Sequence, residues 1–205
     1  MCRYRRINVA PLVLLLAITS CREAPNPSRE QSKAAGQAEP VSAKTAFWEM
    51  YKSAHSWAAD RTPLAVVSKQ VAGVKNQAGK AGMWTATFAS PQRHEARIYT
   101  YSVISAAPDI YKGVTQSHPI RWGGPTQDAL PFESSQFAID SDKAYETAAA
   151  QAASWTKKHP DKEVSLTLGN ATRFSAPVWY VLWGEQKSGY SVLVNATTGA
   201  VVKQR

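Results

Sequence analysis

The sequence predicts an α+β fold built from two tandem units, each consisting of a helix followed by three antiparallel strands. The first observation is a self-match, in which Ser53–Trp57 aligns with Gln151–Trp155 at an offset of 98 residues. The second is that apolar residues recur at helical spacing in both copies. The third is that segments with strand-like alternation follow each helix in the same order. A helix that covers one face of an antiparallel sheet is a common two-layer arrangement.

Both expected helices carry an apolar stripe at relative positions 0, 3, 7 and 10, which lie on one side of an α-helix. The stripes consist of Phe47, Met50, Ala54 and Trp57 in the first copy and Tyr145, Ala148, Ala152 and Trp155 in the second. Ser42 is the expected N-cap of the first helix, and Asp140 or Ser141 that of the second. Prolines at positions 63 and 160 mark where the helices must have ended. The tryptophans that end the two stripes are expected to be buried between helix and sheet.

Six strand segments follow the helices, three after each. They are Leu64–Val71, Trp84–Phe88 and Tyr99–Val103 in the first copy and Val164–Leu168, Trp179–Trp183 and Tyr190–Val194 in the second. These elements predict a first unit at residues 42–104 and a second at 140–205, with a joiner at residues 105–139 that is rich in Pro and Gly. Short extended pieces are expected in the joiner at 110–114 and 136–139.

The N-terminal segment has the features of a secretory leader. A basic front is followed by an apolar run, Val9–Ile18, which is shorter than the ~20 residues needed to span a bilayer. The run ends in Ile18-Thr19-Ser20-Cys21, which resembles the lipobox of bacterial lipoproteins. The resemblance implies a signal peptide at residues 1–20 and a diacylglycerol on the Cys21 thiol. The alternative is an ordinary secretory leader in which Cys21 occurs by chance.

Residues 21–41 are expected to form the lipidated cysteine and a flexible tether. They contain three prolines and almost no large apolar side chain, so they cannot bury enough surface to become ordered. A tether of roughly 20 such residues has a root-mean-square end-to-end distance of about 25 Å. By resemblance to enterobacterial sorting rules, Arg22 rather than Asp after the cysteine implies an outer-membrane location. We therefore expect a domain in the cell envelope that faces the periplasm and is held to the membrane through its lipid.

Charge and motifs exclude several functions. The net charge is +9, and cleavage before Cys21 lowers it by three because the leader contains three arginines and no acidic residue. The remaining basic residues are scattered, so no nucleic-acid partner is expected. Two cysteines are too few for a disulfide framework or a multi-cysteine metal site. No catalytic motif is present, so we expect no catalytic residue, no cofactor and no metal, and we interpret Asp140 and Asp142 as helix caps rather than a calcium site.

The second copy resembles a known secreted module. Pro177–Val181, followed by Gly189–Val201 with its Asn195-Ala-Thr-Thr-Gly199 turn, is similar to the end of a PepSY domain. Asn195 stands where that family usually has Asp, and both side chains can bond the backbone ahead of them. The resemblance covers residues 140–203 and implies a PepSY-like, or more broadly cystatin-like, helix-on-sheet unit. Some members of the family resemble protease propeptides or inhibitory modules.

These observations predict a non-catalytic binding or inhibitory module, not an enzyme, with an envelope protein or a protease as its partner. Edge strands of small sheets can accept an extended peptide by strand addition. Trp122 lies beside Gly123-Gly124-Pro125 and is the candidate for contact with a partner, since aromatic side chains on Gly-rich loops are typical contacts. The alternative is a small-ligand-binding or hydrolytic α+β cone domain with the joiner as its lid.

Overall fold

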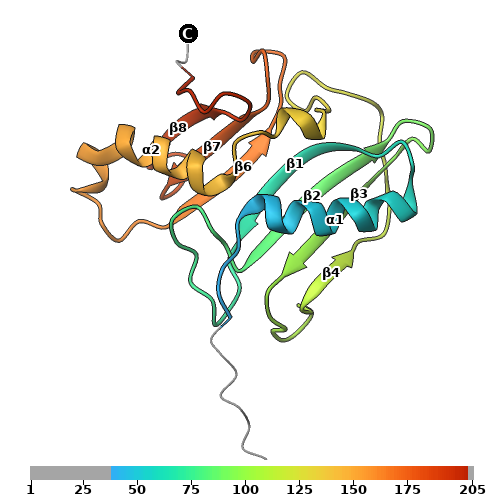
Figure 1. Cartoon of the computed structure of the whole chain (residues 1–205), viewed down its shortest axis with the longest axis horizontal. Coiled ribbons are helices and arrows are strands. Elements are labelled where there is room, and N and C mark those ends of the chain that lie inside the picture. The colour runs from blue at the N-terminus through green and yellow to red at the C-terminus, as the bar shows by residue number, and fades with distance from the viewer. Residues whose placement is uncertain (1–37, 203–205) are drawn as a thin grey trace, which may run out of the picture. The chain divides into compact units, whose positions relative to one another are not determined.

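The computed structural model describes residues 38–202, which form one antiparallel sheet of eight strands and two α-helices packed on the same face of it (Figure 1). The expected α+β class is therefore confirmed. The sheet order is β4-β3-β2-β1-β6-β7-β8, with β5 paired to β3 beside β4. The elements are α1 (Ala43–Trp57), β1 (Thr62–Lys69), β2 (Met83–Ser90), β3 (Glu95–Ser102), β4 (Gly113–Gln116), β5 (Ile120–Arg121), the 3-10 turn η1 (Ser134–Gln136), α2 (Ser141–Thr156), β6 (Val164–Gly169), β7 (Val178–Trp183) and β8 (Tyr190–Asn195).

The joiner differs in part from expectation. Its first half forms β4 and β5, which extend the sheet beyond β3. The extended piece expected at 136–139 is wrong, because η1 occupies its start. Here Gln136 Oε1 accepts a hydrogen bond from the Glu133 N–H at 2.9 Å, which closes a tight turn. This turn directs the ring of Phe137 into the core, where it is almost completely buried.

Strands β1 and β6 join the two helix-plus-three-strand segments into a single sheet. Ala65–Val67 pairs with Thr167–Gly169, and beyond this pairing the Ser68 hydroxyl accepts a hydrogen bond from the Leu166 N–H at 2.9 Å. One continuous hydrophobic core lies between this sheet and both helices. At its centre the rings of Trp84 and Trp179 meet edge to face, with centroids 6.4 Å apart, a favourable aromatic geometry.

The two helices begin next to each other, and their caps are shared. Ser42 is the N-cap of α1, as the sequence predicts, and of the two candidates for α2 the N-cap is Asp140. The Asp140 carboxylate accepts hydrogen bonds from the N–H groups of Ser141 at 2.7 Å and of Lys44 at 2.9 Å. The Ser141 hydroxyl accepts from the Ala43 N–H at 2.9 Å. Asp140 therefore stabilises the positive ends of both helix dipoles at once.

Replacing Asp140 with alanine should lower the free energy of unfolding by about 1–2 kcal/mol, because two helix N-termini lose an acceptor. Asp142 is the matched control, since its carboxylate accepts only the exposed N–H of Lys143 within α2. Urea denaturation followed by circular dichroism measures both variants. Equal losses for Asp140→Ala and Asp142→Ala would show that the cap is not shared.

The two tryptophans that end the helical stripes differ in burial. Trp57 is buried, with 9% of its surface exposed, as expected. Trp155 is only half-buried, so that expectation is wrong for the second helix. Its ring stacks on Tyr190 of β8, with centroids 5.8 Å apart, and lies 4.3 Å from the His159 ring. The reason is topological: β8 ends the sheet on its side, whereas β4 extends the sheet past β3 beside Trp57.

The turn after β8 has the expected geometry. The Asn195 side chain accepts hydrogen bonds from the N–H groups of Thr197 and Thr198 at 2.8 and 2.9 Å. Gly199 has a φ of +77°, a conformation that glycine adopts without strain. The Asn195 side chain therefore closes this turn through two backbone N–H groups.

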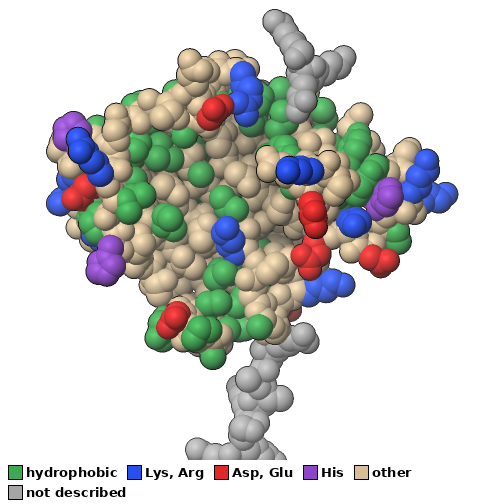
Figure 2. All heavy atoms as spheres, turned by 180° about the vertical axis from the view of Figure 1, so that it is seen from behind, with side chains coloured by type: hydrophobic (Ala, Val, Ile, Leu, Met, Phe, Trp, Pro, Cys, Tyr) green, Lys and Arg blue, Asp and Glu red, His purple; other side chains and the backbone are tan. Residues whose placement is uncertain are grey.

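Within residues 38–202, no helix covers the opposite face of the sheet. Figure 2 shows this side, where small apolar patches alternate with uncharged polar surface and most charges lie toward the margins. Thr85 and Thr87 of β2 belong to this face, since they alternate with the buried Trp84 and Phe88. Neither helix within residues 38–202 has the length and hydrophobicity to cross a membrane.

Candidate functional site

A cleft of about 430 Å³ lies between the C-terminal half of α1 and the edge of the sheet formed by β3 and β4. We call it the Trp57 cleft. Its lining residues are Ser53, Ser56, Trp57, Arg97, Tyr99, Val114, Thr115 and Gln116. The cleft is therefore built from one helix, one strand of the first segment and one strand of the joiner.

Local periodicity places the important side chains in the cleft. Trp57 is the last residue of the apolar stripe of α1, so its ring points at the sheet. Arg97 and Tyr99 are two residues apart on β3 and share its helix-facing side. Gln116 of β4 lies opposite Tyr99 in the strand pairing. These four side chains come from three elements and converge below the end of α1.

Three polar atoms of this group are buried and make no hydrogen bond of good geometry with residues 38–202. They are Trp57 Nε1, Arg97 Nε and Tyr99 Oη. Buried polar groups are nearly always paired, because each unpaired one costs about 1–3 kcal/mol of desolvation. Three such atoms around a single hollow make it a candidate binding site.

Arg97 sets the electrostatics of the cleft. Its Nη1 donates to Gln116 Oε1 at 3.1 Å, and its guanidinium lies 5.2 Å from the centre of the Trp57 ring, within the range of a cation–π contact. The ion pairs within the described residues do not include Arg97, so its charge has no carboxylate counterpart there. The cleft is therefore electropositive.

Tyr99 contributes a neutral donor. Its side chain is fully buried. Burial raises the pKa of the Tyr99 hydroxyl above its ordinary value, and the positive charge of Arg97 and a weak hydrogen bond from its guanidinium to the Tyr99 oxygen oppose that rise. The hydroxyl consequently stays protonated at neutral pH, and its O–H remains a donor without an acceptor among residues 38–202.

In the second half of the chain, the position that corresponds to Arg97 holds a different kind of residue. Trp84 pairs with Tyr101 on β3, and Trp179 pairs with Val194 on β8. Counting four residues back along each strand gives Arg97 in the first half and Tyr190 in the second. Tyr190 stacks on Trp155, whereas Arg97 lies over Trp57 beside the cleft. An arginine therefore stands where the second half has an aromatic ring.

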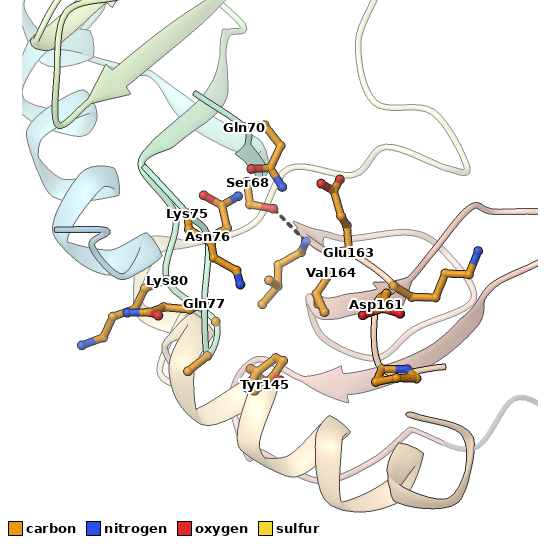
Figure 3. A pocket seen from close by; sticks show the side chains of 15 residues that line it. Ser68, Gln70, Lys75, Asn76, Gln77, Lys80, Tyr145, Asp161, Glu163 and Val164 are labelled. Carbon is orange, nitrogen blue, oxygen red and sulfur yellow. Dashed lines mark hydrogen bonds between the residues drawn. The ribbon is translucent and has the colours of Figure 1, made fainter. Parts of the chain in front are cut away.

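Two other hollows lack this convergence of unpaired donors. Figure 3 shows one of about 460 Å³, in which the Ser68 hydroxyl already accepts a hydrogen bond and Lys80 extends away from the hollow. The other, of about 500 Å³, lies on the uncovered sheet face beside the exposed Arg173–Asp128 ion pair. Among the described residues, no buried side-chain polar atom without a partner lines either hollow. The Trp57 cleft is therefore the candidate site.

The residues singled out from the sequence lie elsewhere. Cys21 is outside the described residues. Trp122 follows β5, is half-buried, and its N–H donates to the His94 carbonyl at 2.8 Å, away from the Trp57 cleft. Asp140 and Asp142 bond helical N–H groups. Between residues 38 and 202, no three or more His, Cys, Asp or Glu side chains gather as potential metal ligands.

The edges of the sheet offer little room for strand addition. β4 is four residues long. On the outer edge of β8, Val201 lies opposite Val194, and the Val202 N–H donates to the Leu193 carbonyl at 2.8 Å. Part of that edge is therefore occupied by the chain itself, and a side-chain site fits a ligand better than either edge does.

Sequence reasoning missed Arg97, Tyr99 and Gln116 as site residues. One signal was present, because Arg97 shares the period-2 face of Tyr99 and Tyr101, and a charged residue on an otherwise aromatic inward face is unusual. Gln116 gave no such signal, since its position depends on the joiner returning to pair with β3.

No protein-family model matches the chain, and no curated protein matches it significantly. Among solved structures, a similar chain is that of a "putative lipoprotein" from Clostridium difficile 630. The two chains share 10% sequence identity with a TM-score of 0.45, over 81% of this chain and 91% of that one. The Trp57 cleft is therefore interpreted from its own residues.

Proposed function

We propose that this chain is a lipid-anchored protein of the cell envelope, held by a diacylglycerol on Cys21 in the outer membrane and facing the periplasm. The basic front, the short apolar run and the Ile18-Thr19-Ser20-Cys21 ending support the anchor. Arg22 supports the outer membrane. Residues 21–41 would then act as the tether that holds the folded domain clear of the lipid headgroups.

The domain acts, in this proposal, as a non-catalytic binding or inhibitory module, and the Trp57 cleft is its binding site. The observation that carries this function is the convergence of three buried, unpartnered polar atoms on one hollow. The described residues that line the cleft include no histidine, carboxylate or cysteine, so the cleft holds donors but no general base. Such a site is suited to holding a ligand or a partner's side chain rather than transforming it.

We also propose that the fold arose as two tandem PepSY-like, cystatin-like units. Matching contacts in the two halves support this origin, with the acceptors 98 residues apart and the donors 95 residues apart. The indole N–H of Trp84 donates to the Val41 carbonyl at 3.0 Å, and that of Trp179 donates to the Ile139 carbonyl at 2.9 Å. Each acceptor lies just before its helix. The first unit would then have diverged toward binding, with Arg97 at the place of an aromatic ring.

A second candidate is a small-ligand-binding or hydrolytic α+β cone domain with the joiner over its site. One observation favours the small-ligand form, since Val114, Thr115 and Gln116 belong to the joiner and form the outer wall of the cleft. The hydrolytic form would in addition need a base supplied from outside the lining residues. Turnover of an ester or peptide by the purified protein would favour that form.

Photo-crosslinking in cells tests the binding function. A photoreactive amino acid at position 56 is placed on the exposed rim of the Trp57 cleft, and the full-length chain is expressed in the bacterium that makes it. Irradiation should produce a covalent adduct, which mass spectrometry identifies as a protein or a small molecule. The control position is Ile98, which is 41% exposed and lies on the opposite face of β3. No adduct at position 56, or equal adducts at both positions, would contradict the assignment of the site.

A further inference from the structure

The unpaired polar groups of the Trp57 cleft are hydrogen-bond donors, and they surround one positive charge. The indole N–H of Trp57 and the guanidinium of Arg97 can only donate, and the Tyr99 hydroxyl is a protonated donor. The side-chain amide of Gln116 supplies the acceptor that meets Arg97, at 3.1 Å. Arg97 is half-buried, and among the described residues no acidic side chain lies within ion-pair distance of it. A group that accepts several hydrogen bonds and carries negative charge would complete this set.

We propose that the Trp57 cleft binds a carboxylate, with Arg97 as its ionic partner and with Tyr99 and Trp57 donating to its oxygens. This assignment rests on the proposed binding function and names the chemical class of the ligand. Arginine pairs with carboxylates through two parallel N–H···O bonds, which are short and strong where solvent is excluded. The carboxylate comes either from a small organic acid or from the C-terminus of a protein.

The geometry indicates how the ligand enters. The Gln116 amide oxygen, at the exposed end of β4, accepts a hydrogen bond from one N–H group of the Arg97 guanidinium. A carboxylate oxygen is a stronger acceptor than an amide oxygen, so it displaces Gln116 and turns the guanidinium toward the ligand. Tyr99 Oη and Trp57 Nε1 are shielded from solvent in the free protein, so the same movement must uncover them before they can donate to the ligand.

Charge and shape favour a carboxylate over other ions. One guanidinium balances the single charge of a carboxylate, whereas a phosphate dianion would leave excess negative charge in a partly buried place. A cation would be repelled by Arg97. The Trp57 ring and the partly buried Val114 supply apolar surface for the carbon skeleton next to the carboxylate. We therefore expect an acid with an apolar group near its carboxylate.

The test uses the full-length lipidated protein in a nonionic detergent and two probes that differ only in charge. N-acetylphenylalanine carries the carboxylate, and N-acetylphenylalanine amide lacks it. The NMR signal of the Trp57 indole N–H, assigned by its loss in Trp57→Phe, should shift on titration with the acid and stay in place with the amide. Arg97→Gln should weaken acid binding at least about tenfold, the effect of losing a charge-assisted pair.

Two further variants separate binding from folding. Arg61→Gln is the matched control, because Arg61 also lies over an aromatic ring, at 4.0 Å from that of Tyr51, and also has a buried Nε without a partner among residues 38–202, yet it does not line the cleft. It should leave acid binding unchanged. Tyr99→Phe should weaken acid binding while leaving the melting temperature of the free protein equal or higher, because it removes a buried hydroxyl that has no partner.

The outcomes show whether the carboxylate comes from a small acid or from a protein C-terminus. They also separate failure of the carboxylate assignment from failure of the binding function. A decapeptide with a C-terminal Phe carboxylate that binds more tightly than N-acetylphenylalanine indicates a protein C-terminus, and equal binding indicates a small acid. Both support the carboxylate site. Equal shifts with acid and amide, or unchanged acid binding by Arg97→Gln, overturn it. If photo-crosslinking from position 56 still succeeds, the binding function stands and only the ligand class is wrong.

Discussion

Replacing Trp179 with alanine should lower the free energy of unfolding by about 3–5 kcal/mol, the usual cost of removing a large aromatic side chain from a core. Trp179 is fully buried at the centre of the shared core. Its ring packs edge to face on Trp84 and on Phe137, with centroids 6.4 and 5.6 Å apart. Its indole N–H also donates a hydrogen bond to the Ile139 carbonyl, which lies directly before α2. The substitution therefore removes packing, aromatic contacts and a hydrogen bond together.

Trp155→Ala is the matched control for this prediction. Trp155 is half-buried and stacks on Tyr190 at the edge of the sheet, so much of its surface already faces water. Its replacement should cost less than half as much as that of Trp179. Urea denaturation monitored by circular dichroism gives both values from the transition midpoints. If Trp155→Ala lowered the free energy of unfolding more than Trp179→Ala does, the centre of the core would lie elsewhere.

Replacing Cys21 with alanine should abolish lipid attachment, which is an all-or-none effect. The thiol is the atom that would receive the diacylglycerol, and alanine has no nucleophilic atom in its place. Cells fed radiolabelled palmitate should label the wild-type chain and not Cys21→Ala. Cys2→Ala is the control, because Cys2 lies in the expected signal peptide and leaves with it. Equal labelling of the wild type and Cys21→Ala would exclude lipidation at this residue.

The helices and their caps were predictable because their causes are local. Ser42 and Asp140 each precede an apolar stripe of helical period, and both are N-caps in the structure. The strands were predictable for the same reason, since alternation of period 2 is visible in any short window. What the local patterns could not show is that Asp140 also reaches Lys44, which is close to it only after folding.

Burial of the two stripe-ending tryptophans shows where local reasoning stops. Periodicity fixed the side of the helix on which Trp57 and Trp155 lie, and both point at the sheet. It carried no information on how far the sheet extends beneath them. β4 comes from the joiner and extends the sheet beside Trp57, whereas Trp155 stands over the last strand. Exposure therefore depended on a long-range pairing between β3 and β4.

The candidate site was hidden for a related reason. A buried donor without a partner is a property of the assembled structure, because it depends on every group that surrounds the atom. Arg97 and Tyr99 are ordinary residues of an alternating strand in the sequence. Trp122, which its Gly-rich surroundings favoured, lies instead beside the start of β3 and outside the cleft.

Both halves of the chain share one hydrophobic core, and this constrains how their sequences can change during evolution. Because Trp84 and Trp179 pack on each other and Asp140 caps both helices, neither half can accept a disruptive substitution in these groups without damage to the other. Residues at this seam should therefore vary together between related chains. Trp57 and Tyr99 belong to the same shared core, whereas the rim of the Trp57 cleft at Ser56 and Gln116 is exposed and lies outside it. The rim can therefore change from species to species while the scaffold stays the same.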